Sequence, residues 1–431
     1  MNVMVNGRGT PDRSERMRAR VEVFKPENTR FDLEGQRVDL KTFRVTNLEN
    51  PTPTTPGLME TGKASEVMEQ HRDRKDFVHQ LFGKDLVKIP YTLLHADQKG
   101  LFGDFSSPEG QDLFADADMV IEDGENSLPE WATDLHRFAE LKLGRRFTLD
   151  EELTALRGLE RRGKSMRFTV GMSRYSQAFF SMGSEGVRLE LTDEDRQRLK
   201  ESGFDSSHLD ELEGLTELLQ GTHGARTIRE VIQKETGGLP DFNQRVHHYL
   251  LGVAGTVLTR DGDVVFVNRG AGVSVNRGIN VTASGGVKFK KEYLARHGLQ
   301  RHLGRQMHEE AREEIGLKSG DLLLGAMQER IALELGVGES EYDLVPVGMA
   351  RELPRGGSPE VMFMIQFRGD TQDLVNRIAG NTHEDRSEID SLVYAYPMEE
   401  VRKLLKQSDA ERVVQHKGLL NLMMMDRYLS Q

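Results

Sequence analysis

The sequence predicts an α/β (α+β) protein that is mainly helical before residue 244 and strand-bearing after it. Apolar residues recur at helical spacing in the first part, as they do between Trp131 and Leu141. Later, the apolar runs 253–259 and 264–269 flank an Asp-Gly pair, which is typical of a β-hairpin. The apolar stretch EVMFMIQF at 360–367 indicates a buried strand.

Composition bounds the class of protein. The chain has 431 residues, of which 37% are hydrophobic and 30% charged, a length that suggests two or three domains. Lys and Arg total 58 against 70 Asp and Glu, for a net charge of -12, which disfavours nucleic acid as a partner.

No apolar run approaches the ~18 residues of a membrane span, and the basic start leads into no apolar stretch typical of a secretory signal. We therefore expect a cytoplasmic protein with no membrane partner. The absence of Cys excludes disulfides and thiolate metal sites.

Three units are predicted along the chain. Residues 1–60 include the breaker-rich stretch 47–57 and are expected to form a flexible arm and linker. Residues 61–243 are expected to form a mainly helical domain of unknown type. The loop 237–243 closes this unit, and residues 244–431 make up the third.

Helical signals fill the middle unit. The apolar spacing predicts helices over residues 65–86, 129–143 and 149–162. Residues 166–180 suit a strand followed by a turn or a short helix. Thr192 is expected to cap a helix together with Asp195, three residues later, in a variant of the capping box. Helical spacing then continues, with breaks, to about Thr236.

The acidic segment HEEAREEIGL at 308–317 carries the strongest chemical signal. If residues 303–315 are helical, Glu310, Glu313 and Glu314 stand at i, i+3 and i+4 and project from one face. Three like charges this close repel one another, and a hard cation would remove that cost. Mg²⁺ and Mn²⁺ prefer oxygen ligands and commonly join carboxylates to substrate phosphates. The spacing therefore predicts a metal site, and a solvated, salt-bridged helix is the alternative.

This segment resembles the signature of the Nudix hydrolases, Gx5Ex7REUxEExGU, in which U is an aliphatic residue. Gly286 and Glu292 match the opening Gx5E. The second half is matched by Glu310, Ala311, Glu313, Glu314, Gly316 and Leu317. The order of elements is also similar to the family: a hairpin, the double glycine Gly285-Gly286, the acidic box, and a closing strand and helix from Glu388 to Val401. Two departures are visible. Glu309 stands where the signature has Arg, and sixteen residues rather than seven separate Glu292 from Glu309.

The resemblance implies a mixed-sheet α/β/α sandwich over residues 244–431 and a hydrolase that cleaves a nucleoside diphosphate linked to another group. It implies Mg²⁺ or Mn²⁺ as the cofactor and a nucleotide-type small molecule as the substrate. The implied metal ligands are Glu310, Glu313 and Glu314, of which Glu313 and Glu310 are the catalytic residues. The implied substrate-binding residues are Gly285, Gly286 and Arg269. Glu384, Asp385 and Glu388 are candidates for a further base or ligand, and a homodimer is compatible with the sequence.

Other chemistries have weaker support. His308-Glu309 begins like the zinc motif HExxH, but Arg312 occupies the second His position. The sequence contains no GxSxG elbow, Walker loop or dinucleotide fingerprint. Adjacent His247 and His248 cannot share one face of a helix or strand, so they are interpreted as structural or surface residues. The alternative function is a catalytically weak Nudix-like module that binds a nucleotide as a sensor, which Glu309 and the lengthened box favour.

Overall fold

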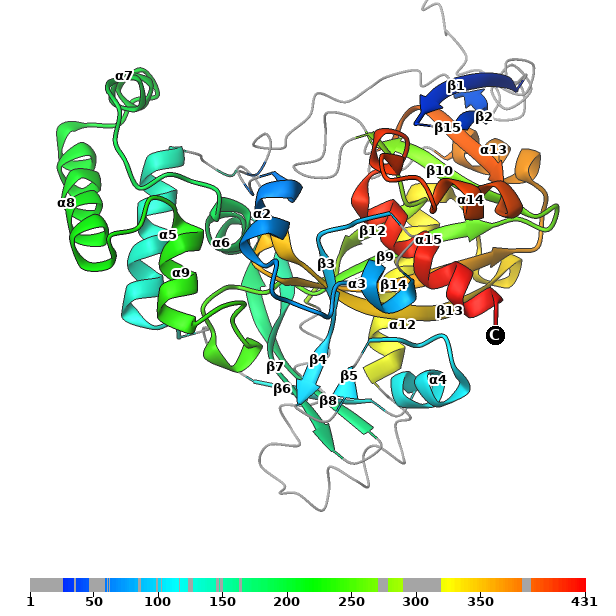
Figure 1. Cartoon of the computed structure of the whole chain (residues 1–431), viewed down its shortest axis with the longest axis horizontal. Coiled ribbons are helices and arrows are strands. Elements are labelled where there is room, and N and C mark those ends of the chain that lie inside the picture. The colour runs from blue at the N-terminus through cyan, green and yellow to red at the C-terminus, as the bar shows by residue number, and fades with distance from the viewer. Residues whose placement is uncertain are drawn as a thin grey trace, which may run out of the picture.

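A ten-stranded mixed sheet forms the centre of this α+β protein (Figure 1). The computed structural model describes residues 26–431 except 35, 46–58, 60, 62, 84–86, 98–99, 102, 116, 123–126, 145–146, 148–149, 163–164, 270–277, 290–318 and 382–388. The main path of the sheet runs in the order β1-β2-β15-β10-β9-β14-β13-β3, while β11 pairs with β10 and β12 with β9. Among the described pairs of this sheet, only β9 and β14 run parallel.

The strands of this sheet are β1 (Glu27–Leu33), β2 (Gln36–Arg44), β3 (Tyr91–Leu93), β9 (Gly252–Leu258), β10 (Asp263–Arg269), β11 (Gly278–Asn280), β12 (Ala283–Gly286), β13 (Tyr342–Glu352), β14 (Ser358–Phe367) and β15 (Ile389–Pro397). Two smaller sheets contain β4 (His95–Asp97) with β5 (Gly100–Leu101), and β6 (Asp118–Ile121) with β7 (Glu152–Arg162) and β8 (Ser165–Arg174). The predicted hairpin is confirmed in β9 and β10. Gly262 in its turn has φ +85°, a conformation that favours glycine.

Helices surround the sheets. In the N-terminal half they are α2 (Ala64–Gln70), α3 (Val78–Phe82), α4 (Pro108–Ala115), α5 (Glu130–Leu143), α6 (Tyr175–Ser181), α7 (Asp193–Glu201), α8 (Ser206–His223) and α9 (Ile228–Thr236). In the C-terminal half they are α12 (Ser319–Arg330), which continues as the π-helical turn η3 (Ile331–Leu335), then α13 (Thr371–Gly380), α14 (Met398–Leu404) and α15 (His416–Leu429). The helix predicted over 303–315 lies outside the described residues.

Both faces of the large sheet are buried, and β10 shows how the sequence achieves this. Val264 and Phe266 point into a core shared with α14 and α15. Val265 and Val267 point to the opposite face, where they join a core shared with α12, η3 and α13. A continuous apolar run is typical of a strand that is covered on both sides. The C-terminal part is therefore three layers deep, with helices on each face of the sheet.

The first sixty residues contribute more than the expected arm. β1 and β2 form an antiparallel hairpin, and β2 pairs with β15 near the end of the chain. Val38 and Leu40 are fully buried in the core that contains α14. The prediction of a flexible arm is thus wrong for residues 27–44. Alternate apolar side chains of this hairpin are buried against residues that lie far away in the sequence.

The middle unit is less helical than predicted. The helix expected over 149–162 is wrong, because these residues form strand β7, paired with β8. Leu153, Leu156 and Leu159 are all buried in one core although they stand three apart. A register shift between Leu156 and Gly158 places Leu156 and Leu159 on the same face, since the extra residue of a bulge changes which face the following side chains occupy. The helix expected over 65–86 is divided into α2 and α3, whereas α5 and the strand and short helix over 166–180 are confirmed.

Thr192 caps α7 as predicted. Its side chain accepts a hydrogen bond from the Asp195 backbone N–H at 3.1 Å, and the Asp195 carboxylate accepts from the Thr192 backbone N–H at 3.2 Å. Replacing Thr192 with Ala should lower the free energy of unfolding by about 1 kcal/mol, because one N-terminal amide of α7 loses its partner. Urea denaturation would measure this loss, and a Thr192→Ser variant should retain most of the stability. Equal stability of the Ala variant and wild type would contradict the role of the cap.

None of the helices within the described ranges combines the length and apolar character needed to cross a membrane.

Candidate functional site

The double glycine lies on β12, beside strand β9. Gly285 pairs with Val253, and Gly286 pairs with Gly252. A Cβ atom at Gly285 would overlap the guanidinium of Arg330, so only glycine leaves room for that side chain. A Cβ atom at Gly286 would instead approach Leu153 of β7 to 3.2 Å. The two glycines therefore face different parts of the molecule, Gly285 toward α12 and Gly286 toward β7.

Buried charges from the end of α12 lie against Gly285. Arg330 is 8% exposed, and Glu334, one helical turn later in η3, is 1% exposed. Their side chains are 3.9 Å apart, and the second carboxylate oxygen of Glu334 accepts a hydrogen bond from the Ser284 backbone N–H at 3.4 Å. Burying an ionised carboxylate is costly unless it is paired and hydrogen-bonded, and these two contacts offset part of that cost.

Arg269 belongs to the same cluster. It is the last residue of β10, and its guanidinium donates a hydrogen bond to the Ser284 hydroxyl. The structure thus brings two of the three predicted substrate-binding residues, Arg269 and Gly285, to either side of Ser284. This cluster of Arg269, Ser284, Gly285, Arg330 and Glu334 is called the β12 cluster below. It contains two guanidinium groups and one carboxylate, so it carries a net positive charge.

The predicted metal ligands Glu310, Glu313 and Glu314 lie outside the described residues. So do Glu292 and Glu309 of the box and the candidate bases Glu384, Asp385 and Glu388. Within the described part of the chain, no three or more Asp, Glu or His side chains are grouped closely enough to hold a metal ion. The β12 cluster offers a single carboxylate, and that carboxylate faces the Arg330 guanidinium.

Sequence reasoning missed Arg330 and Glu334. A signal was present, because residues 329–337 carry a weaker copy of the second half of the signature. Ile331, Glu334, Gly336 and Val337 occupy its first aliphatic, third Glu, Gly and final aliphatic positions. In this copy Arg330 stands at the position of the first Glu. Gly336 has φ +68° and ends the π-helical turn η3.

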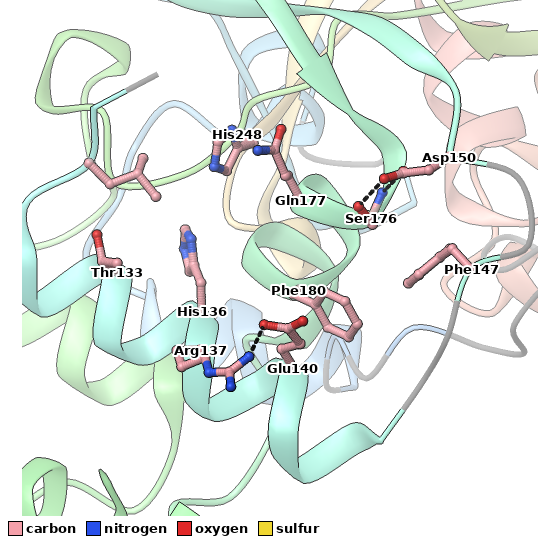
Figure 2. A pocket seen from close by; sticks show the side chains of 11 residues that line it. Thr133, His136, Arg137, Glu140, Phe147, Asp150, Ser176, Gln177, Phe180 and His248 are labelled. Atoms are coloured by element: carbon pink, nitrogen blue, oxygen red, sulfur yellow. Dashed lines mark hydrogen bonds and ion pairs between the residues drawn. The ribbon is translucent and has the colours of Figure 1, made fainter. Parts of the chain in front are cut away.

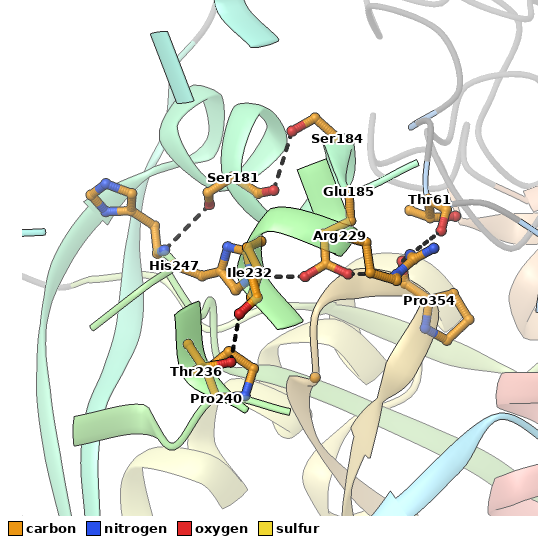
Figure 3. A network of polar contacts seen from close by, with 12 residues as sticks. Thr61, Ser181, Ser184, Glu185, Arg229, Ile232, Thr236, Pro240, His247 and Pro354 are labelled. Carbon is orange, nitrogen blue, oxygen red and sulfur yellow. Dashed lines mark hydrogen bonds and ion pairs between the residues drawn. The ribbon is translucent and has the colours of Figure 1, made fainter. Parts of the chain in front are cut away.

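A second buried polar network joins the N-terminal helices to the large sheet (Figure 3). Glu185 receives a hydrogen bond from Arg229 of α9 at 2.9 Å and forms another with His247 at 2.8 Å. Arg229 also donates to the backbone carbonyl of Pro354 at 2.9 Å and to that of Thr61. Pro354 directly follows β13 in a short 3-10 turn. One side chain thus ties α9 to the sheet.

The charge state of Glu185 follows from these contacts. Burial raises the pKa of this carboxyl, but Arg229 and the hydrogen bond with His247 outweigh burial and hold the pKa below its ordinary value. Glu185, Arg229 and His247 are 3%, 5% and 0% exposed. This burial agrees with the interpretation of His247 as a structural residue. Because all three side chains are buried, we assign this network to stability.

Comparisons with known proteins add little. No family model matches the chain, and no curated protein matches it either. Among solved structures, the crystal structure of DR0079 from Deinococcus radiodurans is 13% identical and covers 36% of this chain and 73% of its own, with a TM-score of 0.22. A likeness this small carries no argument about fold or function.

Proposed function

We propose that the C-terminal part is a Nudix-like domain that hydrolyses a nucleoside diphosphate linked to another group, using Mg²⁺ or Mn²⁺. The observation that carries this proposal is the acidic box at 309–317, which the chain places two residues before α12. Helix α12 in turn delivers Arg330 and Glu334 to the double glycine on β12. A segment rich in metal-binding carboxylates therefore leads directly into a helix that ends beside a positively charged cluster.

The chemistry assigned to the box rests on Glu310, Glu313 and Glu314. Carboxylates at this spacing would hold the divalent cation, which neutralises a diphosphate and lowers the pKa of bound water. Attack of that water on phosphorus would break one phosphoanhydride bond and release a mononucleotide. Glu313 and Glu310 are the proposed catalytic residues. In the β12 cluster, Arg269 supplies a guanidinium suited to a phosphate oxygen, and the backbone at Gly285 and Gly286 lies beside it.

The test is metal-dependent turnover of a panel of nucleoside diphosphate derivatives by the full chain. Wild type should release a mononucleotide with Mg²⁺ or Mn²⁺, and a Glu313→Gln plus Glu314→Gln variant should lose this activity. Glu309→Gln is the matched control, because it neutralises a carboxylate of the same segment that has no assigned metal role. Activity retained by the double variant, or lost equally in the control, would contradict the assigned ligands.

A second candidate function is a nucleotide sensor of weak or no catalytic competence. One described feature favours it: the guanidinium of Arg330 pairs with Glu334 at the position where the weaker copy of the signature would need a carboxylate. Absence of turnover across the panel, combined with a nucleotide-dependent rise in thermal stability, would select this function over the hydrolase.

A further inference from the structure

A cavity opens between α5 and α6 in the N-terminal half (Figure 2). Its volume is about 560 Å³, which lies within the range of sites for small molecules. Thr133, His136 and Glu140 of α5 face Gln177 and Phe180 of α6 across it. Among the lining residues that the structure describes, none belongs to the β12 cluster.

The inner wall of the cavity presents a hydrogen-bond acceptor. Within the described part of the chain, Nε2 of His136 is buried and has no hydrogen-bond partner. The side chain also hydrogen-bonds the backbone of Val246, which leaves Nε2 for another group. Burial, followed by the neighbouring His247 and His248, holds the pKa of His136 well below its ordinary value. The imidazole is therefore neutral at physiological pH, and its Nε2 can accept a hydrogen bond from a donor group of a ligand.

The charged side chains around the cavity favour a cation over an anion. Glu140 and Asp150 line it, and among the described lining residues Arg137 is the one cation. The Arg137 guanidinium donates to Glu140 at 2.8 Å and to both oxygens of Glu211 at 2.7 and 3.0 Å. Its charge is thus already matched by two carboxylates, one of which lies outside the cavity. Asp150 pairs in turn with Arg174 at 4.0 Å. The described residues around the mouth thus supply three carboxylates and two guanidinium groups, so an anionic ligand would meet a surplus of negative charge.

Apolar side chains complete the lining. Phe147 and Phe180 meet edge to face, with ring centroids 5.5 Å apart at 89°, and Leu128 also lines the cavity. This surface suits a ligand with an apolar or aromatic body, because burying such a body removes apolar area from water. A cationic group next to the phenyl faces gains a further attraction.

We propose that this cavity binds a small organic amine, with its ammonium group between His136 and Glu140 and its apolar body against Phe147 and Phe180. The ammonium N–H groups donate to the neutral imidazole nitrogen and to the carboxylate. The proposal is independent of the nucleotide chemistry assigned to the C-terminal part. A transition-metal ion is disfavoured, because within the described residues no three His, Asp or Glu side chains are grouped closely enough to hold one.

Calorimetric titration of the full chain with three probes of the same shape tests the proposal. Phenethylamine carries the ammonium group, phenethyl alcohol replaces it with a hydroxyl, and hydrocinnamate replaces it with a carboxylate. Phenethylamine should bind at least about tenfold more tightly than the alcohol, because hydrogen bonds to charged groups are the stronger ones. Hydrocinnamate should bind more weakly still.

Two variants provide the matched comparison. Glu140→Gln and Glu211→Gln each remove one carboxylate partner of Arg137, and the two side chains are similarly exposed, 49% and 43%. Only Glu140 lines the cavity. Glu140→Gln should weaken phenethylamine binding by about tenfold, whereas Glu211→Gln should leave it unchanged. Thermal unfolding of both variants would check that they are folded.

Three results would overturn the proposal. These are equal binding of the amine and the alcohol, tighter binding of hydrocinnamate, and no binding of phenethylamine by folded wild type at millimolar concentration. Equal loss of binding in both variants would also overturn it, since Glu140 would then act only through Arg137. Full affinity of a His136→Leu variant for the amine would show that the imidazole does not contact the ammonium group, which contradicts the proposal.

Discussion

Replacing Arg229 with Met should lower the free energy of unfolding by about 3–5 kcal/mol, the range expected when one partner of a buried ion pair is removed. The methionine would fill similar space but leave the buried Glu185 carboxylate with His247 alone. The Pro354 and Thr61 carbonyls would lose the guanidinium as well. Because Arg229 joins α9 to the turn after β13, the loss should also loosen the N-terminal helices from the large sheet. Urea denaturation followed by circular dichroism would measure both effects.

Arg226→Met is the matched control for this experiment. Arg226 precedes α9 by two residues and is exposed, so its replacement should change stability by less than about 0.5 kcal/mol. A double Arg229→Met, Glu185→Leu variant should recover part of the loss, because an apolar pair no longer buries an uncompensated charge. Equal stability of Arg229→Met and wild type would show that the Glu185 network does not stabilise the fold.

Stability should fall steeply as the pH drops below about 6.5, the ordinary pKa of histidine. Burial, and then His247 and Arg157, lower the pKa of His248 to about 4. Burial also lowers the pKa of His71 to about 4, and that of His136 well below its ordinary value. A histidine whose pKa is depressed in the folded state binds more protons when unfolded, so acid favours unfolding between the two pKa values. The contribution of His248 alone is about 2 kcal/mol between about pH 7 and about pH 5.

Denaturation at these two pH values, in wild type and in His248→Gln, would check this prediction. Glutamine can still hydrogen-bond Ser173, which lies 3.0 Å from His248 Nδ1, but it does not titrate. The variant should therefore lose less stability than wild type on acidification. The same slope in both proteins would mean that burial of His248 does not produce the acid sensitivity.

Local patterns were sufficient for much of the fold. The Asp-Gly turn, the Thr192 cap, α5 and the last strand and helix depend on residues close together in sequence, and all four are confirmed. The failures involve long-range pairing. The alternating apolar residues of β1 and β2 identify a hairpin of the large sheet only once the pairing of β2 with β15 is known. β7 has part of the apolar spacing of a helix because its bulge puts Leu156 and Leu159, three residues apart, on one face.

The candidate sites divide in the same way. The acidic box is a local pattern, so the sequence alone predicted its chemistry, and that chemistry stays a prediction. The β12 cluster depends on Arg269, Gly285 and Arg330 meeting from three elements, and no spacing rule connects them. The cavity beside His136 was harder to predict from sequence, because His248 and Gln177 reach it from separate segments. An unpartnered nitrogen becomes visible only when the neighbouring backbone is placed.

The pairing of β2 with β15 also constrains how the protein is made. During synthesis β2 leaves the ribosome early, whereas β15 is among the last strands to emerge. Until then the edge of β2 that later pairs with β15 is open, and an unpaired strand edge invites pairing with other chains. At the opposite edge of the sheet, β3 likewise has no partner strand until β13 has been made. Completion of the large sheet therefore comes late in translation, and a chain that stops before Ile389 would carry an edge that its own sequence cannot close.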